Sequence, residues 1–385
     1  MLRTRYDEDH EAFRDVIRTF IAKEMTPYFA DWEREGKVPR ELFRKLAEIG
    51  AIGFDMPEEY GGPGPTSYRF QQIMLEEAAK AGVGFGHHTV STGIVLPYLL
   101  RLANTEQRNR WFPEILRGDT MLCIAMTEPG TGSDLAGIRT TARLSEDGTE
   151  YILNGAKTFI TGARNSELCV VVARTSPVAA NNRRFGLSLL VVPTDSEGFE
   201  IGRKLEKLGL HAQDTSELSF TDVRVPVENL LGEQDLGFSY LGQNLPRERL
   251  AIGAGAAAMA TAAIGLAQDY VRGREIFGQS VAAFQNTKFV LAECSAEAEA
   301  VQVMVDRGVE LDDAGELTAA DAARIKLFAT EAASRVIDKC LQLHGGYGYM
   351  VEYPIARLYA DNRVQRIYGG TSEVLKTIIA KDMGL

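Results

Sequence analysis

The chain contains little cysteine. Its four cysteines among 385 residues, Cys123, Cys169, Cys294 and Cys340, lie far apart, so they form neither a disulfide framework nor the ligand spacing of a metal site. We therefore expect reduced, mostly buried thiols and no bound metal. The first residues, MLRTRYDEDH, are charged and no apolar run follows them, so we expect no secretory signal. These features predict a cytoplasmic protein.

An excess of positive charge is also missing. Lysine and arginine number 42 against 53 aspartates and glutamates, which gives a formal net charge of -11. A nucleic-acid surface needs a basic patch to replace phosphate counterions, so nucleic acid is not an expected partner. Local arginines and helix N-termini can still bind the phosphates of a cofactor.

Long hydrophobic runs are scarce. Residues 251–268, AIGAGAAAMATAAIGLAQ, lack charge over about the length of a membrane span. They are mostly alanine and glycine, which gain little from contact with lipid. We expect a helix packed closely on its neighbours in a helical domain, and no membrane span.

The composition, with 45% apolar and 25% charged residues, is that of an ordinary globular protein. The chain is longer than a single core usually supports, which predicts several domains. Apolar residues recur at three- and four-residue spacing up to residue 118, with breaks at residues 61–67 and 82–88 that are rich in glycine. This pattern predicts an all-α domain over residues 1–120.

Short runs of β-branched and aromatic residues dominate the next segment, which predicts a β domain over residues 121–231. The pairs Asp147-Gly148 and Asn154-Gly155 each lie between two such runs and predict consecutive hairpins. Helical periodicity returns over residues 232–385, where Thr318 and Asp321 predict a capping box at the start of the last long helix. The expected fold class is therefore α+β and multidomain.

The loop AMTEPGTGSD, residues 125–134, joins the first domain to the second. Its small residues expose backbone N–H groups and hydroxyls that can bind flavin edges or diphosphate oxygens, although such a loop alone is also typical of a tight turn. It resembles the T-E-P-G-x-G-S-D motif of the acyl-CoA dehydrogenase family. The resemblance implies that Met126 and Thr127 contact the isoalloxazine ring of FAD, and that Ser133 lies between the diphosphate and the substrate.

Three further motifs follow in the order of that family. Residues 159–161 (FIT) resemble its W-I-T strand, residues 274–285 resemble its R-x-x-F-G and aromatic-Gln pair, and residues 342–348 resemble its Q-x-x-G-G-x-G segment. The implied FAD-binding residues are Phe159, Thr161, Arg274, Phe277, Phe284, Gln285, Gln342, Gly345, Gly346, Thr371, Ser372 and Glu373. In the family the R-x-x-F-G and aromatic-Gln pair reaches the FAD of a neighbouring subunit, which implies an oligomer. We expect a homotetramer built as a dimer of dimers.

The segment Tyr-Gly-Gly-Thr-Ser, residues 368–372, carries Gly369 where many family members place their catalytic glutamate. A carboxylate can reach the same point from Glu248 in LPRERL, a sequence that resembles the long-chain branch. The resemblance then implies that Glu248 is the base and that Arg249 and Gly370 contact the substrate, while the backbone N–H of Gly369 holds the thioester oxygen. In the alternative interpretation Glu248 only pairs with an arginine on a solvated helix face.

The resemblance covers nearly the whole chain and implies an N-terminal all-α domain, a middle β-barrel or sandwich, and a C-terminal four-helix bundle. It implies an acyl-CoA dehydrogenase of fatty-acid β-oxidation that converts an acyl-CoA to a trans-2-enoyl-CoA and passes electrons to an electron-transferring flavoprotein. Two alternatives stay open: an acyl-CoA oxidase of the same fold, and a non-catalytic protein that binds flavin or CoA.

Overall fold

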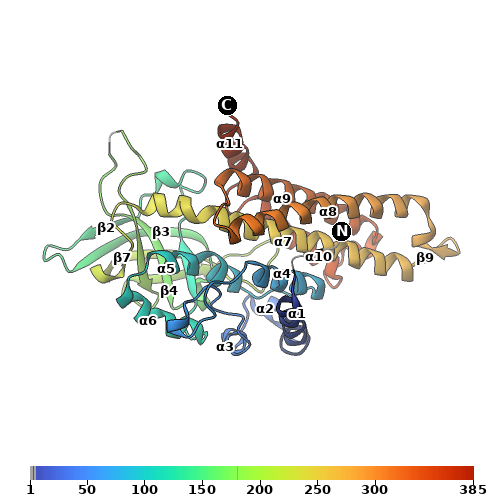
Figure 1. The fold of residues 1–385 in the computed structure, drawn as a ribbon, viewed down its shortest axis with the longest axis horizontal. Helices are drawn as coiled ribbons and strands as arrows, with labels where there is room; N and C mark the ends of the chain where they lie inside the picture. The colour runs from blue at the N-terminus through green and yellow to red at the C-terminus, as the bar shows by residue number, and fades with distance from the viewer. Residues whose placement is uncertain (1–2, 4–5, 180) are drawn as a thin grey trace.

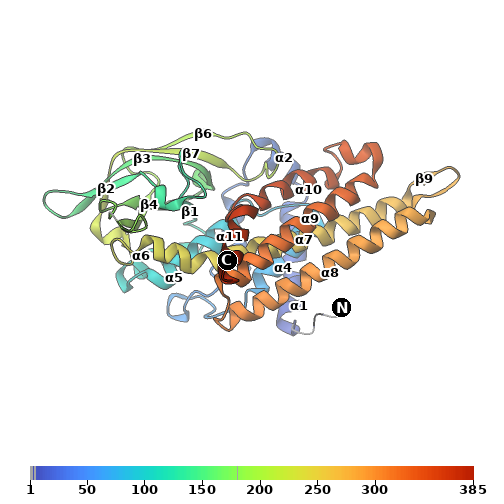
Figure 2. The same ribbon diagram turned by 90° about the horizontal axis from the view of Figure 1, so that it is seen from above.

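The computed structural model describes residue 3, residues 6–179 and residues 181–385. The chain forms a helical part, a β-sheet and a second helical part in that order (Figure 1). The sheet occupies one end of an elongated molecule, and the long helices of the C-terminal part reach the other end, as Figure 2 also shows.

The N-terminal part is helical, as predicted. Its α-helices are α1 (Glu8–Phe20), α2 (Phe29–Glu35), α3 (Glu41–Glu48), α4 (Arg69–Ala81), α5 (Leu96–Leu102) and α6 (Thr105–Leu116), with π-helical turns at Ile21–Met25 and Thr89–Val95. Asp7 caps α1 by accepting a hydrogen bond from the backbone N–H of His10. Gly82, with φ +66°, ends α4, because glycine tolerates this left-handed backbone. Both predicted helix breaks are therefore confirmed.

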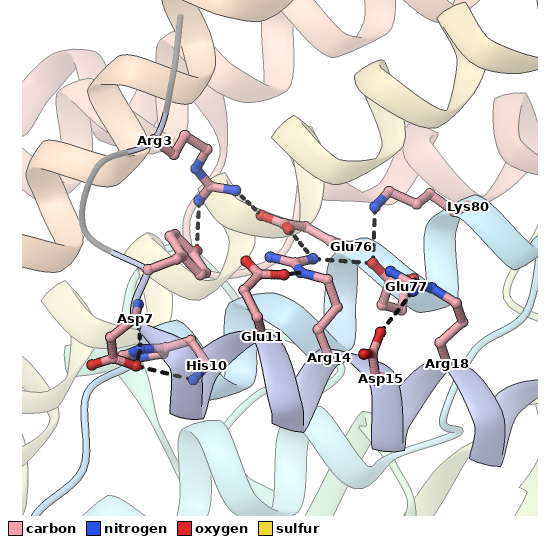
Figure 3. Close-up of polar contacts among 11 residues, drawn as sticks. Arg3, Asp7, His10, Glu11, Arg14, Asp15, Arg18, Glu76, Glu77 and Lys80 are labelled. Atoms are coloured by element: carbon pink, nitrogen blue, oxygen red, sulfur yellow. Dashed lines mark hydrogen bonds and ion pairs between the residues drawn. The ribbon is translucent and has the colours of Figure 1, made fainter.

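Buried ion pairs join α1 to α4 (Figure 3). The guanidinium group of Arg14 contacts Glu76 at 2.8 Å and Glu77 at 3.0 Å, and all three side chains are largely buried. Arg3 extends the cluster by pairing with Glu76 and with Asp306 of the C-terminal part. The cluster fixes α4, which in turn packs on the C-terminal helices.

The β domain is one eight-stranded sheet in the order β6-β7-β3-β2-β4-β5-β8, with β1 parallel to β4. The strands are β1 (Leu122–Ala125), β2 (Thr141–Leu144), β3 (Glu150–Thr161), β4 (Leu168–Arg174), β5 (Leu187–Pro193), β6 (Phe199–Lys204), β7 (Thr215–Pro226) and β8 (Leu230–Leu231). The turn at Asp147-Gly148 joins β2 to β3, which confirms that hairpin.

The hairpin predicted at Asn154-Gly155 is wrong. Both residues lie inside β3, where the register with β7 shifts between Leu153 and Gly155. A Cβ atom at Gly155 would stand 2.5 Å from the Thr140 hydroxyl oxygen, and its φ is +149°. The glycine thus permits a bulge and a close backbone approach, a role that a sequence pattern does not distinguish from a turn.

Three long helices form the centre of the C-terminal part: α7 (Gly237–Gly273), α8 (Gln285–Asp313) and α9 (Ala319–Gln342). Two shorter helices, α10 (Pro354–Asn362) and α11 (Ser372–Asp382), pack on α9. A small hairpin of β9 (Glu275–Ile276) and β10 (Gln279–Ser280) joins α7 to α8 at the end of the molecule away from the sheet (Figure 2). Thr318 caps α9 by accepting from the N–H of Asp321, which confirms this half of the predicted capping box. The Asp321 carboxylate accepts from the Thr318 hydroxyl and not from its backbone N–H.

Helix α7 is the central element of the C-terminal part. Among the described helices it alone is long and apolar enough to cross a membrane, and 67% of its most apolar window is buried inside the protein. It packs on α4, α8, α9 and α10. The small side chains of its alanine-rich segment allow these helices to approach closely. A core of apolar side chains also joins the N-terminal helices to β4 and β5 and reaches the start of α7. Residues on α7 are therefore held from several sides.

Candidate active site

Glu248 lies in the N-terminal third of α7 and is 6% exposed. Its Oε2 atom has no hydrogen-bond partner, and no ion pair between described residues includes it. Buried carboxylates are usually paired or hydrogen-bonded, so an unpaired one calls for a functional explanation. The alternative of an arginine-paired glutamate on a solvated helix face is wrong.

The electrostatic environment of Glu248 suits a base. Burial raises the pKa of Glu248 to about 7, while the positive charges of Arg249 and Lys326 act in the opposite direction. A general base works best when its pKa lies near the working pH, because it is then both ionised and basic enough to take a proton.

Gly369 and Gly370 form a turn beside this carboxylate. A Cβ atom at Gly369 would stand 3.3 Å from Oε1 of Glu248 and 2.4 Å from Cδ1 of Ile252. Both glycines have positive φ, +63° and +99°, where larger residues are disfavoured. Glu248 thus reaches the place to which a side chain at 369 would extend.

Two cations hold the carbonyl groups of this turn. Nε of Arg249 donates to the Gly369 carbonyl at 3.3 Å, and Nζ of Lys326 donates to the Gly370 carbonyl at 2.7 Å. No backbone acceptor is found for the N–H of Gly369 within the described part of the chain. This N–H is a free donor next to an unpaired carboxylate, which is the pair of groups that enolate formation from a thioester requires.

The residues expected at the flavin ring lie together on the sheet. Met126 and Thr127 follow β1, and they adjoin β3 through a 2.9 Å hydrogen bond from the N–H of Thr158 to the carbonyl of Thr127. On β3, Phe159 is 67% exposed and has φ +60°, at a shift of register between Lys157 and Ile160. Such backbone strain in a bulky residue typically marks a functional site. An exposed ring on a strained bulge fits a planar group such as an isoalloxazine.

Two residues that sequence reasoning missed fix this loop. Lys157 is fully buried, pairs with Glu128 at 3.0 Å, and donates to the carbonyl of Met126 at 3.1 Å. Glu128 also accepts from the backbone N–H groups of Arg139 and Thr140. The sequence signal that could have identified Lys157 is a lysine that stands among the β-branched and aromatic residues of a predicted strand.

The remaining predicted FAD residues separate into two groups. The larger group lies around the β9-β10 hairpin and the end of α9, away from the sheet (Figure 2): Arg274, Phe277, Phe284, Gln285, Gln342, Gly345 and Gly346. Phe277 is 93% exposed, with φ +51°, and the Arg274 guanidinium lies 5.9 Å from the centroid of the Tyr347 ring. One chain alone therefore does not bring these residues to Met126 and Phe159.

The second group starts α11. The hydroxyl of Thr371 accepts from the N–H of Val374 and caps the helix, while Glu373 is exposed. The hydroxyl of Ser372 is buried and donates to Glu331 at 2.7 Å. Ser133 lies exposed in the loop after β1.

His344 is a structural group. Its ring is buried, stacks on Tyr270 with 4.4 Å between centroids, and places Nδ1 2.8 Å from the carbonyl oxygen of Cys340. Burial lowers its pKa. These contacts use the ring for packing at the end of α9.

Comparison with known proteins places this geometry in a family. Models described as acyl-CoA dehydrogenase N-terminal, middle and C-terminal domains match residues 7–119, 123–223 and 235–384. The mitochondrial long-chain specific acyl-CoA dehydrogenase of Sus scrofa is 41% identical over 99% of this chain and 88% of its own length.

Solved structures agree. An acyl-CoA dehydrogenase from Geobacillus kaustophilus matches with a TM-score of 0.96 and 43% identity, over 99% of this chain and 100% of that one. Another from Bacillus anthracis, complexed with FAD, matches with a TM-score of 0.91 and 29% identity, over 100% of this chain and 68% of that one. Matched along its whole length by all three domain models and by these relatives, the chain belongs to the acyl-CoA dehydrogenase family.

Proposed function

We propose that the protein catalyses the FAD-dependent α,β-dehydrogenation of an acyl-CoA thioester to a trans-2-enoyl-CoA, with Glu248 as the base. The observation that carries this proposal is the buried, unpaired carboxylate of Glu248 beside the Gly369-Gly370 turn. Family membership favours an enzyme over a non-catalytic flavin protein. The similarity to mitochondrial long-chain specific acyl-CoA dehydrogenases supports a fatty acyl-CoA as substrate.

Glu248, the Gly369-Gly370 turn and the two cations that hold this turn each have a role in this reaction. Glu248 takes the α-proton, so the electron pair of the α C–H bond forms the double bond as a hydride leaves the β-carbon. The N–H of Gly369 donates to the thioester oxygen and stabilises the charge that develops there. Arg249 and Lys326 hold the carbonyls of the turn, which keeps that N–H in place.

FAD, when bound, supplies the hydride acceptor through N5 of its ring. Met126, Thr127, Phe159 and Thr161 would hold the ring, with Ser133 towards the diphosphate and the substrate. The exposed ring of Phe159 on its strained bulge supports this assignment. Electron-transferring flavoprotein is the proposed acceptor of the electrons.

Residues of the far group, such as Arg274 and Gln285, would bind FAD of a second subunit in a homotetramer built as a dimer of dimers. Their distance from the sheet within one chain supports this arrangement. Co-expression of two inactive variants tests this shared site. Glu248→Gln and Arg274→Ala should each be inactive alone. A mixed dimer of the two contains one site in which both residues are intact, so activity should return. If the mixture stays inactive, Arg274 serves its own chain or no site.

Anaerobic mixing with palmitoyl-CoA tests the reaction itself. The wild-type flavin absorbance should bleach, and Glu248→Gln should bleach at least about a hundredfold more slowly, because a positioned base contributes roughly 10²–10⁴-fold. Glu316→Gln, at an exposed glutamate before α9, is the matched control and should behave as wild type. Equal bleaching by Glu248→Gln and wild type would remove Glu248 from the mechanism.

An oxidase of the same fold is distinguished under air. A dehydrogenase passes its electrons to an artificial acceptor and forms little peroxide, whereas an oxidase forms one peroxide for each enoyl product. If one peroxide forms for each enoyl product, oxygen and not electron-transferring flavoprotein is the electron acceptor.

A further inference from the structure

The proposed reaction uses the hydrogen bond of Lys326 to the turn but leaves the buried charge of this residue unexplained. Lys326 lies on α9, its side chain has no solvent exposure, and its ammonium group donates to the Gly370 carbonyl at 2.7 Å. None of the ion pairs between described residues includes it. Burying an ammonium group without a carboxylate partner is costly, and an apolar residue of similar length would fill the space more cheaply. A function is needed to explain the charge.

The position of Lys326 relative to Glu248 suggests that function. A single point, the place of a Cβ atom at Gly369, lies 3.3 Å from Oε1 of Glu248 and 3.5 Å from Cε of Lys326. The two side chains therefore converge on the same turn from different helices, α7 and α9. The lysine can act on the carboxylate through its charge and on the turn through its hydrogen bond.

We propose that Lys326 is a positioning residue of the proton-abstraction site, which fixes the Gly369-Gly370 turn through the Gly370 carbonyl and holds a positive charge beside Glu248 that keeps this base ionised. The inference rests on the proposed role of Glu248. In this assignment Arg249 and Lys326 share the turn, each holding one of its two carbonyl groups.

The charged and titratable groups around the base fit this role. Glu248 faces Arg249 from its own helix and Lys326 from α9, and it also faces the phenols of Tyr98 on α5 and Tyr368 before the turn. Lys326 faces Arg249, Glu248 and Glu331. Burial and the charge of Arg249 lower the pKa of Lys326 to about 8, against the two carboxylates. The lysine thus remains mainly charged at neutral pH, where the base must lose its proton.

A purely structural lysine would leave the ionisation of Glu248 unchanged, and the pH dependence separates the two roles. Lys326→Met removes the charge and the donor, Lys326→Gln removes the charge, and Lys326→Arg keeps the charge. Lys339→Met, on the same helix but partly exposed and paired with Glu293 at 3.0 Å, is the matched control. FAD content and thermal midpoint are measured for every variant to establish folding.

The first readout is the rate of anaerobic flavin bleaching by palmitoyl-CoA between pH 5.5 and 9. An opposite charge nearby lowers a carboxyl pKa by roughly 1–3 units, so Lys326→Met and Lys326→Gln should move the midpoint upward by at least about one pH unit. Below the wild-type midpoint the rate then falls about tenfold and recovers at high pH. Lys326→Arg and Lys339→Met should keep the wild-type midpoint.

The second readout needs no turnover. Infrared difference titration detects the protonated carboxyl of Glu248 as a band that Glu248→Gln lacks, and Lys326→Met should raise the midpoint of that band by the same amount. An unchanged midpoint in both readouts, in folded Lys326→Met or Lys326→Gln, overturns the proposal. If Glu248→Gln bleaches like wild type, the proposed base is wrong, while the infrared comparison still decides whether Lys326 sets the ionisation of Glu248.

Discussion

Oε1 of Glu248 lies 3.3 Å from the point where a Cβ atom of residue 369 would stand. A glutamate on α7 and a glutamate at position 369 would therefore place carboxylates in one small volume, approached from opposite sides. Because two carboxylates cannot both ionise at such close range, a glycine at 369 and a glutamate at 248 form one consistent solution.

Moving the catalytic carboxylate from position 248 to position 369 should need three substitutions: Glu248→Gly, Gly369→Glu and Ile252→Val. Glu248→Gly should abolish activity, and adding Gly369→Glu should restore only a small part. The new side chain meets Cδ1 of Ile252 at 2.4 Å and sits at φ +63°, which costs roughly 1–2 kcal/mol for a residue with a Cβ atom. Adding Ile252→Val removes that methyl group and should raise kcat by about tenfold over the double variant. If the double and triple variants have equal kcat, the contact does not limit the relocation.

Gly369→Pro would remove the N–H donor but would also change the backbone. The proline ring requires a φ near -65°, whereas Gly369 has φ +63°, so the substitution would rebuild the whole turn. A substrate analogue in which a methylene group replaces the thioester carbonyl, an S-alkyl-CoA thioether, removes the acceptor of this hydrogen bond and leaves the backbone unchanged. Such an analogue should bind wild type more weakly.

The rate of flavin bleaching should rise with pH through neutrality. Burial raises the pKa of Glu248 to about 7, and only the ionised carboxylate accepts a proton, so the rate should increase tenfold per pH unit below this value and level off above it. Stopped-flow measurement across pH 5.5–9 gives the profile. A profile that is already flat at pH 5.5 would mean that the base has an ordinary carboxyl pKa.

Glu248→Gln should stabilise the protein at alkaline pH. The folded-state pKa is about 7, above the ordinary 4.5, so above pH 7 folding buries an ionised carboxylate at a cost that disappears once pH falls below 4.5. Glutamine is neutral throughout. The free energy of unfolding of Glu248→Gln at pH 8 should therefore exceed that of wild type by on the order of 1–3 kcal/mol. This difference in stability should shrink as the pH falls from 7 to 4.5. Denaturant titrations at pH 8 and pH 5 measure it, and a less stable Glu248→Gln at pH 8 would contradict it.

Arg14→Met should destabilise the N-terminal helices. It leaves Glu76 without a buried partner on α1 and removes one cation from Glu77, and breaking a buried ion pair costs about 3 kcal/mol or more. The matched control is Arg34→Met, which removes an exposed pair with Asp31 and should change stability little. Thermal unfolding of both variants gives the comparison. Equal midpoints would mean that the cluster in Figure 3 adds no stability.

Phe159→Gly should separate stability from cofactor binding. Glycine accepts the φ of +60° without strain, so the apoprotein should gain up to about 1 kcal/mol. The lost aromatic contact should make FAD dissociate at least severalfold faster, as followed by flavin fluorescence. Phe159→Tyr keeps a ring and should retain FAD like wild type. Unchanged FAD release from Phe159→Gly would show that the ring does not contact the flavin.

Local sequence was enough to predict the order of the three parts and the family. Each of these depends on residues close together in the chain, such as the loop at residues 125–134 and the helical period. Glu248 as the base stays a prediction, drawn from the resemblance of LPRERL and the glycine at 369. The cap at Thr318 was predictable for the same reason, since its partner is three residues away.

Tertiary structure alone decided the remaining features. Arg249 and Gly369 are 120 residues apart and Lys326 and Gly370 are 44 apart, so no local pattern reports their contacts. A turn signal at Asn154-Gly155 became a bulge because β7 and Thr140 pack against it. The φ of Gly369 and the burial that raises the pKa of Glu248 arise only when α7, α9 and the turn pack together, because burial and backbone strain belong to the assembled fold and not to any single segment.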